Sequence, residues 1–266
     1  MTPLEAIDQH CKQLRLTGLA QVVPEALALA HQQEWSLESF LVYLLEQEVT
    51  RRQQRRIERY LQQAQLPPGK TLDHFDQHRL PLRIRRQIPG LVQAEFINQA
   101  ENILIFGQPG TGKTHLASAL AFEWVQRGFP VLFNPTFKLV DGLLRAKRDY
   151  ELERELKRLD RFQVVILDDI GYVQQSREEM EVLFTFLAER YERRSVVITS
   201  NLVFSQWDQI FKDPLTTAAA IDRVVHHSRI IEFGSEMTSV RAEQAAQRQL
   251  LERDQVAPDQ TEPKQN

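Results

Sequence analysis

The hydrophobic pattern of the chain changes near residue 66. Over residues 3–64 apolar residues recur at helical intervals, as they do from Leu14 to Val23 and again from Phe40 to Leu45. The stretch WSLESF has the form of a helix start, with Ser36 at the N-cap position. The run Pro67-Pro68-Gly69 then stops the pattern. Residues 1–66 are therefore predicted to form a small all-helical domain, and residues 67–95 a connector.

A second pattern begins near residue 96, where short apolar runs alternate with longer helical segments. This alternation is typical of a parallel sheet flanked by helices. Strands are predicted near residues 102–106, 130–134, 163–168, 195–200 and 229–233. Residues 96–241 are thus predicted to form one α/β domain with a five-stranded parallel sheet, and the polar residues 242–266 a disordered C-terminal tail.

Composition narrows the class of protein. Of the 266 residues 42% are hydrophobic and 26% charged, as in ordinary soluble globular proteins. The longest apolar runs are a few residues long, whereas a membrane span needs about 20, and MTPLEAIDQH lacks the features of an export signal. We expect a cytoplasmic protein without a membrane partner. Cys11 is the only cysteine, which excludes an internal disulfide and a cysteine-rich zinc site.

The stretch ILIFGQPGTGKTHLAS contains a phosphate-binding loop between a predicted strand and a predicted helix. Its glycines let backbone N–H groups surround the phosphates of ATP, and the helix N-terminus adds positive charge. Lys113 is expected to reach the β- and γ-phosphates, and Thr114 to ligate Mg²⁺. The predicted nucleotide-binding residues are Gly107, Gln108, Pro109, Gly110, Thr111, Gly112, Lys113, Thr114 and His115.

The stretch VVILDDIG is a predicted buried strand that ends in two acids. Asp168 stands where a carboxylate holds Mg²⁺ at the carboxyl edge of a sheet. Asp169 points the other way and is predicted to orient or deprotonate the attacking water, which favours hydrolysis. The alternative for Asp169 is a helix cap. After the next strand, Asn201, or failing it Thr199, is expected to face the γ-phosphate, although Asn is also common in turns.

Arginines gather on one face of the helix predicted around residues 51–59, within an arc of about 140° at 100° per residue. Such a face can bind the phosphate backbone of DNA, or it can be a solvated charged surface. A net charge of −3 gives no global positive field, so DNA binding would have to rely on local patches. The predicted DNA-binding residues here are Arg51, Arg52, Arg55, Arg56 and Arg59.

Two adjacent histidines, His226 and His227, raise the question of a metal site. Adjacent residues on a strand point to opposite sides, and no acid or cysteine cluster accompanies the pair in the sequence. We therefore interpret both histidines as structural or interface residues.

Several stretches together resemble a known family. GQPGTGKTHLASAL, VVILDDIGY, TSNLVFSQWDQIF and IDRVVHHSRIIEF are similar to the IstB transposition helper ATPases of insertion sequences. These helpers are relatives of the DnaC helicase loaders and of DnaA initiators in the AAA+ class. LRLTGLAQ and RRQQRRIERYLQQAQLPPGKTLDHFD extend the resemblance over nearly the whole chain to about Ile231. The expected fold is thus an AAA+ P-loop domain behind a small helical domain.

The resemblance implies an ATP-dependent homo-oligomer that assembles on double-stranded DNA and recruits or stimulates a partner transposase. By position, Arg223 matches the arginine that completes the active site of a neighbouring subunit, with an ion pair to Asp222 as the alternative. Lys138, Arg145 and Arg148 match a region that lines the DNA path in related initiators. FGSEMTSVR departs from the family's glycine, serine, tyrosine and arginine cluster, which leaves a sensor role for Arg241 open.

Other functions use the same ATP-binding parts. A DnaC-like replicative helicase loader is the nearest alternative, and the Trp207 segment with the two histidines favours the transposition helper over it. A nucleotide-dependent adaptor and a P-loop kinase of small molecules are the other two. ATPase assays with and without duplex DNA distinguish these classes.

Overall fold

The structure, a computed structural model, describes residues 1–172, 176–202, 206–207, 224–234 and 239. Arg223 and Arg241 therefore lie outside the described residues. The chain divides into two compact units. The N-terminal unit comprises residues 1–63 with residues 126–128, and the second unit comprises the rest of the chain. Among the helices described, none is long and apolar enough to cross a membrane.

The N-terminal unit contains three helices, α1 (Pro3–Gln13), α2 (Thr17–Gln32) and α3 (Leu37–Ala64). Helix α1 begins with a capping box formed by Thr2 and Glu5. Helix α3 begins directly after Ser36, whose Oγ accepts a hydrogen bond of 3.2 Å from the backbone N–H of Ser39, as the sequence predicts. Helices α2 and α3 pack around a small apolar core made of Val23, Ala26 and Leu44, and α1 contacts α2.

Helix α2 has an N-terminal cap that comes from another helix. Its own N-cap residue, Leu16, makes no capping hydrogen bond. Instead Glu48 of α3, only 5% exposed, accepts hydrogen bonds from the backbone N–H groups of Gly18 (2.7 Å) and Leu19 (2.9 Å). Burial by itself raises the pKa of Glu48, but hydrogen bonds from Arg52, Leu19 and Gly18 outweigh it and lower that pKa. The carboxylate therefore stays ionised and caps α2.

The second unit is an α/β domain. It begins with a short 3-10 helix, η1 (Gln77–Arg79), followed by α4 (Leu82–Val92) and α5 (Glu95–Asn98). The strands are β1 (Asn102–Phe106), β2 (Val131–Pro135), β3 (Val164–Asp168), β4 (Ser195–Ser200) and β5 (Ser228–Glu232). The helices between them are α6 (Lys113–Gln126), α7 (Thr136–Arg148), α8 (Leu152–Leu159), the 3-10 helix η2 (Ile170–Tyr172) and α9 (Arg177–Arg190).

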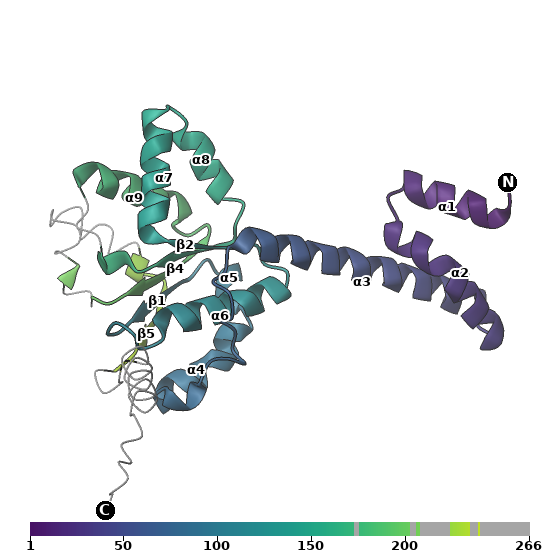
Figure 1. Cartoon of the computed structure of the whole chain (residues 1–266), viewed down its shortest axis with the longest axis horizontal. Coiled ribbons are helices and arrows are strands. Elements are labelled where there is room, and N and C mark those ends of the chain that lie inside the picture. The colour runs from purple at the N-terminus through teal and green to yellow at the C-terminus, as the bar shows by residue number, and fades with distance from the viewer. Residues whose placement is uncertain (173–175, 203–205, 208–223, 235–238, 240–266) are drawn as a thin grey trace, which may run out of the picture. The chain divides into compact units, whose positions relative to one another are not determined.

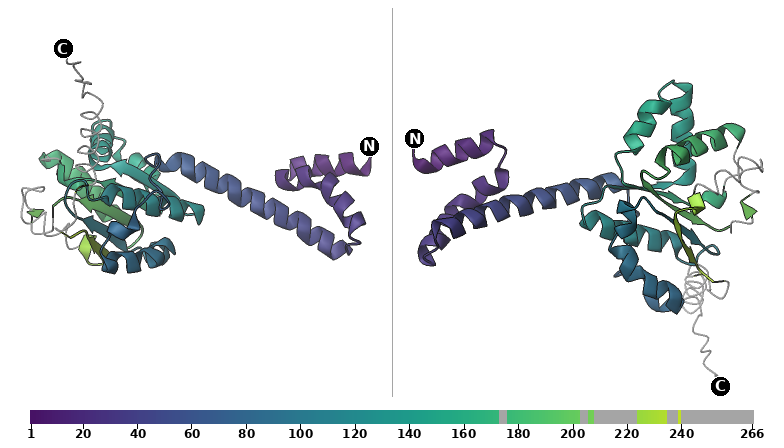
Figure 2. Two further views of the ribbon diagram at one scale, coloured as in Figure 1. Left: turned by 60° about the horizontal axis from the view of Figure 1, so that its bottom comes forward. Right: turned by 180° about the vertical axis from the view of Figure 1, so that it is seen from behind.

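All five strands are parallel and lie in the order β2-β3-β4-β1-β5, which confirms the predicted fold class. Helices α7, α8 and α9 cover one face of the sheet, and α4 and α6 cover the other (Figures 1 and 2). On the first face Leu104, Val165 and Ile198 of the strands pack with Leu143 of α7 and Phe186 of α9. Because the strands are parallel, their carboxyl ends meet at one edge of the sheet, where ligands bind in such folds.

The amino ends of β3 and β4 are held together by one buried arginine. The guanidinium of Arg190, at the end of α9, donates hydrogen bonds of 3.0–3.2 Å to the carbonyls of Leu159, Phe162, Gln163 and Ser195. Burial lowers the pKa of Arg190 to about 9, so the side chain is still charged at neutral pH. This network fixes the turn that joins α9 to β4.

Candidate nucleotide-binding site

The phosphate-binding loop lies between the carboxyl end of β1 and the first turn of α6. Gly110 (φ +81°) and Gly112 (φ +105°) adopt left-handed conformations that residues with a Cβ rarely take. Lys113 opens α6, is 8% exposed, and donates from Nζ to the carbonyl oxygens of Gly107 (2.7 Å) and Gln108 (2.9 Å). The ammonium group thus already lies over the loop, at the helix N-terminus that attracts anions.

A pocket of about 500 Å³ opens beside this loop, a volume usual for small-molecule sites. Three predicted residues, Gly107, Gln108 and Asp168, do not line it. Gly107 and Gln108 hold Lys113 through their carbonyl groups, and Asp168 accepts a hydrogen bond from Thr199. The predicted site residues that do line the pocket are Pro109, Gly110, Thr111, Gly112, Lys113, Thr114, His115, Asp169 and Asn201.

The paired aspartates are joined through one threonine of the neighbouring strand. Thr199 of β4 donates from Oγ1 to Asp168 Oδ1 (2.7 Å) and accepts from the backbone N–H of Asp169 (2.8 Å). Asp169 has a left-handed backbone, with φ of +64°, which is unusual for a residue with a side chain. Thr199 therefore fixes the Asp168 carboxylate and the turn that directs Asp169 into the pocket.

Asn201 stands at the carboxyl end of β4 and lines the same pocket. Its Oδ1 is buried and accepts no hydrogen bond from any residue that the structure describes. The oxygen lies so close to Gly171 that a Cβ at that position would overlap it. A metal ion or a water molecule bound with the nucleotide can therefore supply the partner that Oδ1 lacks, while the NH2 group of the amide is the part that can donate to a phosphate.

One wall of the pocket comes from residues that precede the sheet, within the predicted connector. Phe75 packs against His115, with ring centroids 4.9 Å apart, and lies against Gly112. His115 donates from Nε2 to the carbonyl of Thr71 at 3.1 Å, and burial lowers the pKa of its imidazole, which favours the neutral form. The wall residues, none of them predicted as ligands, are Lys70, His74, Phe75, Asp76, Arg79 and Leu80.

The five arginines of α3 do not form one free surface. Arg52 pairs with Glu48 at 2.6 Å and donates to the carbonyl of Arg15, while Arg55 donates to Thr17 Oγ1. Arg51 is half-buried. Arg56 and Arg59 are exposed, and the structure shows neither of them in an ion pair among the described residues. Arg56 packs against Gly128, and Arg59 lies over the ring of Tyr60 at 5.5 Å, so these two guanidinium groups make contacts of this kind and no ion pair among the described residues.

The other predicted DNA-binding residues lie on α7, directly after β2. Lys138, Arg145 and Arg148 are all exposed. Arg145 forms an ion pair with Asp141 one turn earlier in the helix. Both Lys138 and Arg148 lack an ion pair within the described part of the chain.

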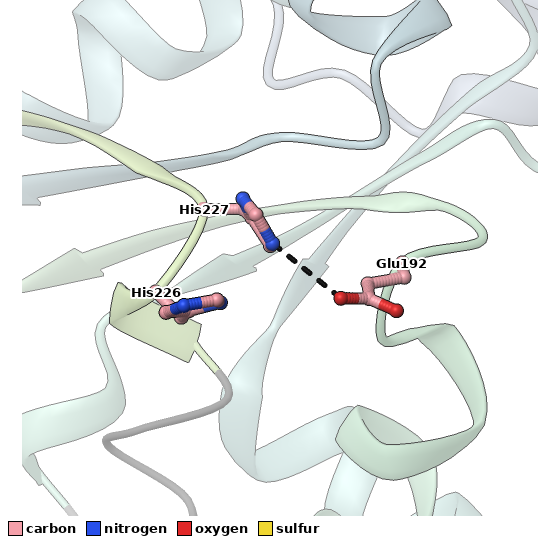
Figure 3. A group of neighbouring side chains, drawn as sticks. All are labelled: Glu192, His226 and His227. Carbon is pink, nitrogen blue, oxygen red and sulfur yellow. Dashed lines mark ion pairs between the residues drawn. The ribbon is translucent and has the colours of Figure 1, made fainter.

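The prediction that His226 and His227 point to opposite sides is wrong. Both lie in a turn before β5, outside the strand, so strand alternation does not apply to them. Their ring centroids are 4.3 Å apart, and Glu192 lies beside them (Figure 3).

Comparison with known proteins gives a consistent match to one family. The model of the family described as IstB-like ATP binding protein matches residues 9–247. An insertion sequence ATP-binding protein of Sinorhizobium fredii is 40% identical over 236 residues, which cover 88% of this chain and 79% of the relative. The insertion sequence IS21 ATP-binding protein of Pseudomonas aeruginosa is 38% identical over 236 residues, which cover 88% of each chain.

Solved structures share the fold. The crystal structure of DnaI superposes with a TM-score of 0.54 at 22% identity and covers 64% of this chain and 95% of that one. The DnaC helicase loader gives a TM-score of 0.50 at 20% identity, with 57% and 89% covered. At this identity the likeness establishes the AAA+ fold and nothing more specific.

Proposed function

Because the chain belongs to the family of IstB-like ATP-binding proteins, we propose that it is an ATP-hydrolysing accessory protein of transposition. Membership of the family establishes ATP binding and the link to insertion sequences. Hydrolysis, DNA binding, self-assembly and action on a partner transposase are the finer parts of the proposal. The observation that supports it best is the convergence of the phosphate-binding loop, Asp169, Thr199 and Asn201 on one pocket.

In this proposal the loop binds the triphosphate, with backbone N–H groups and Lys113 meeting its negative charge. The hydroxyl of Thr114 and the carboxylate of Asp168 would hold Mg²⁺, which neutralises charge on the phosphates when bound. Thr199 keeps Asp168 oriented through a hydrogen bond of 2.7 Å. Phe75 and Leu80 of the wall offer apolar surface to the base.

The two remaining pocket residues would act on the reaction itself. Asp169 accepts the proton of the attacking water, as a carboxylate aimed into the pocket can do. The NH2 group of Asn201, which lines the pocket, would donate to the γ-phosphate and lose that bond on hydrolysis, which gives the protein a way to register the state of the nucleotide.

Double-stranded DNA is the proposed macromolecular partner, with Arg56 and Arg59 of α3 and Lys138 and Arg148 of α7 as backbone contacts. A partner transposase and a location in the cytoplasm belong to the same proposal, and the insertion sequence names of the relatives support its link to a mobile DNA element. The helicase loader alternative rests only on the fold that the chain shares with DnaC.

A nucleotide titration combined with a phosphate-release assay tests the ATPase part of the proposal. Lys113→Ala should lose ATP binding, because the cation over the loop is gone. Asp169→Asn should bind ATP normally and lose turnover, and duplex DNA should raise the turnover of the parent protein. Normal hydrolysis by Asp169→Asn would remove that carboxylate from the chemistry. Phosphate transfer to a metabolite in place of water would instead indicate a kinase.

A further inference from the structure

A group of three exposed side chains lies away from the nucleotide pocket and has no place in the proposed ATPase reaction. Glu192 comes from the turn between α9 and β4, and His226 and His227 come from the turn before β5 (Figure 3). One ligand atom from each residue lies within 4.8 Å of the other two. Two imidazoles and a carboxylate are a donor set that suits zinc and similar divalent transition metals.

We propose that Glu192, His226 and His227 bind one Zn²⁺ ion, with water completing a tetrahedral site. The distance from His227 Nε2 to Glu192 Oε1 is 3.4 Å. Two ligands at zinc bond lengths of about 2.0–2.1 Å are about 3.3 Å apart in a tetrahedron. The pair therefore already has the spacing of two ligands of one ion, and a ring nitrogen of His226 lies within 4.8 Å of both.

The backbone that carries the two histidines is held in place by β1. Asn102 donates from its backbone N–H to the carbonyl of His227 (2.7 Å) and from Nδ2 to the carbonyl of Val224 (3.1 Å). Ser228 Oγ donates to the carbonyl of Val225 at 2.9 Å. The turn is thus fixed at both ends before any ion binds, which reduces the entropy lost on binding.

The carboxylate side of the site is fixed in the same way. Backbone N–H groups of Arg193 and Arg194 bond to the carbonyl of Arg190, whose guanidinium is buried among four carbonyls. Next to Glu192, the hydroxyl of Tyr191 lies 3.4 Å from His226 Nδ1. A partner at Nδ1 leaves Nε2 of that ring for the metal, an arrangement that is usual for metal-binding histidines.

Metal binding would have a structural effect. The site lies at the amino ends of β4 and β5, opposite to the sheet edge that carries the phosphate-binding loop, and β1 separates these two strands. An ion here ties the edge strand β5 to the α9–β4 turn across β1. The effect expected is higher thermal stability of the second unit in the presence of Zn²⁺.

The test uses the full-length protein without an affinity tag, freed of metal by a chelator and without nucleotide. Zn²⁺ titration by calorimetry is expected to show one site, and Co²⁺ is expected to give the visible absorption of tetrahedral coordination. His226→Ala, His227→Ala and Glu192→Gln should each weaken Zn²⁺ binding about tenfold or more. His31→Ala, which removes an exposed histidine of α2, is the matched control and should leave binding unchanged.

Melting temperatures complete the test. Zn²⁺ should raise the melting temperature of the parent and of His31→Ala in a saturable way, and should not raise that of His226→Ala. Circular dichroism without metal shows whether each variant folds. If a histidine variant does not fold, Glu192→Gln, which changes an exposed turn, tests the site in its place. Absence of Zn²⁺ binding by the parent, or unchanged binding by folded Glu192→Gln and His227→Ala, would overturn the site.

Discussion

Thr199 shows how one hydroxyl can organise two acids with different tasks. It donates to the Asp168 side chain and accepts from the Asp169 backbone, and so it uses both of its hydrogen-bonding functions. The second bond holds Asp169 in its left-handed conformation, which otherwise costs about 1 kcal/mol or more. Thr199 is thus a positioning residue for the metal-side acid and for the proposed base.

Replacing Thr199 by valine keeps the shape of the side chain and removes both hydrogen bonds. Thr199→Val should bind ATP with nearly the affinity of the parent, because the phosphate-binding loop is intact. Its hydrolysis rate should fall by about 10²-fold, since both carboxylates lose their orientation. Thr199→Ser retains the hydroxyl and should keep most of the activity. Steady-state phosphate release measures both, and parental turnover by folded Thr199→Val would contradict the role.

Sequence identifies residues of this site where chemistry demands a fixed spacing. The phosphate-binding loop, from Gly107 to Thr114, is recognisable because every position serves the same anion. The wall around Phe75 escapes such reasoning, because an aromatic residue in a segment rich in turns carries no periodic signal. The only indication was that TLDHFD belongs to the stretches that resemble the family.

At the scale of elements, α3 separates into a part that folds the N-terminal unit and a part that remains exposed. Arg52 and Arg55 bind Glu48, Arg15 and Thr17. Helical spacing alone groups them with Arg56 and Arg59, because periodicity reports direction around the helix and not the presence of α1 and α2 beside it.

Two matched double variants distinguish these parts. Arg56→Gln with Arg59→Gln should weaken binding to unrelated duplexes and lower the salt slope by about 0.9 for each lost phosphate contact, with a smaller loss of stability than the second variant. Arg52→Gln with Arg55→Gln should instead lower the melting temperature of the N-terminal unit. Plots of log K against log salt, together with thermal melts, measure the two effects. A salt slope unchanged in the first variant would show that this face does not contact DNA.

The limits of the strands were predicted more closely from the sequence than those of any other kind of element. The limits of β1 and β4 agree with the predicted 102–106 and 195–200, β3 begins one residue later than predicted, and β2 and β5 are each shifted by one residue. Strands that are buried on both faces consist of continuous apolar runs in the sequence, and polar residues end those runs at the sheet edge. The order β2-β3-β4-β1-β5 was not predicted, since pairing between distant segments leaves no local pattern.

At the scale of the whole molecule, the question is whether one chain contains a complete active site. Arg223 is proposed to serve the ATP of a neighbouring subunit, so a mixing experiment is the decisive measurement. A Lys113→Ala subunit lacks a working pocket but keeps Arg223. An Arg223→Ala subunit keeps a working pocket but lacks the arginine. Together with DNA they should recover part of the activity, because such an arginine contributes about 10³–10⁵ in rate. No recovery in samples that co-assemble on sizing would place the arginine elsewhere.

The cap that Glu48 supplies to α2 also constrains the order of events during synthesis. Residues 17–32 leave the ribosome before residue 48, so the first turn of α2 has unsatisfied N–H groups until α3 has emerged. An uncapped helix of this length is marginal in water. The N-terminal unit is therefore expected to form in one step once α3 has been made, and nascent chains that end before Glu48 should be open to proteolysis.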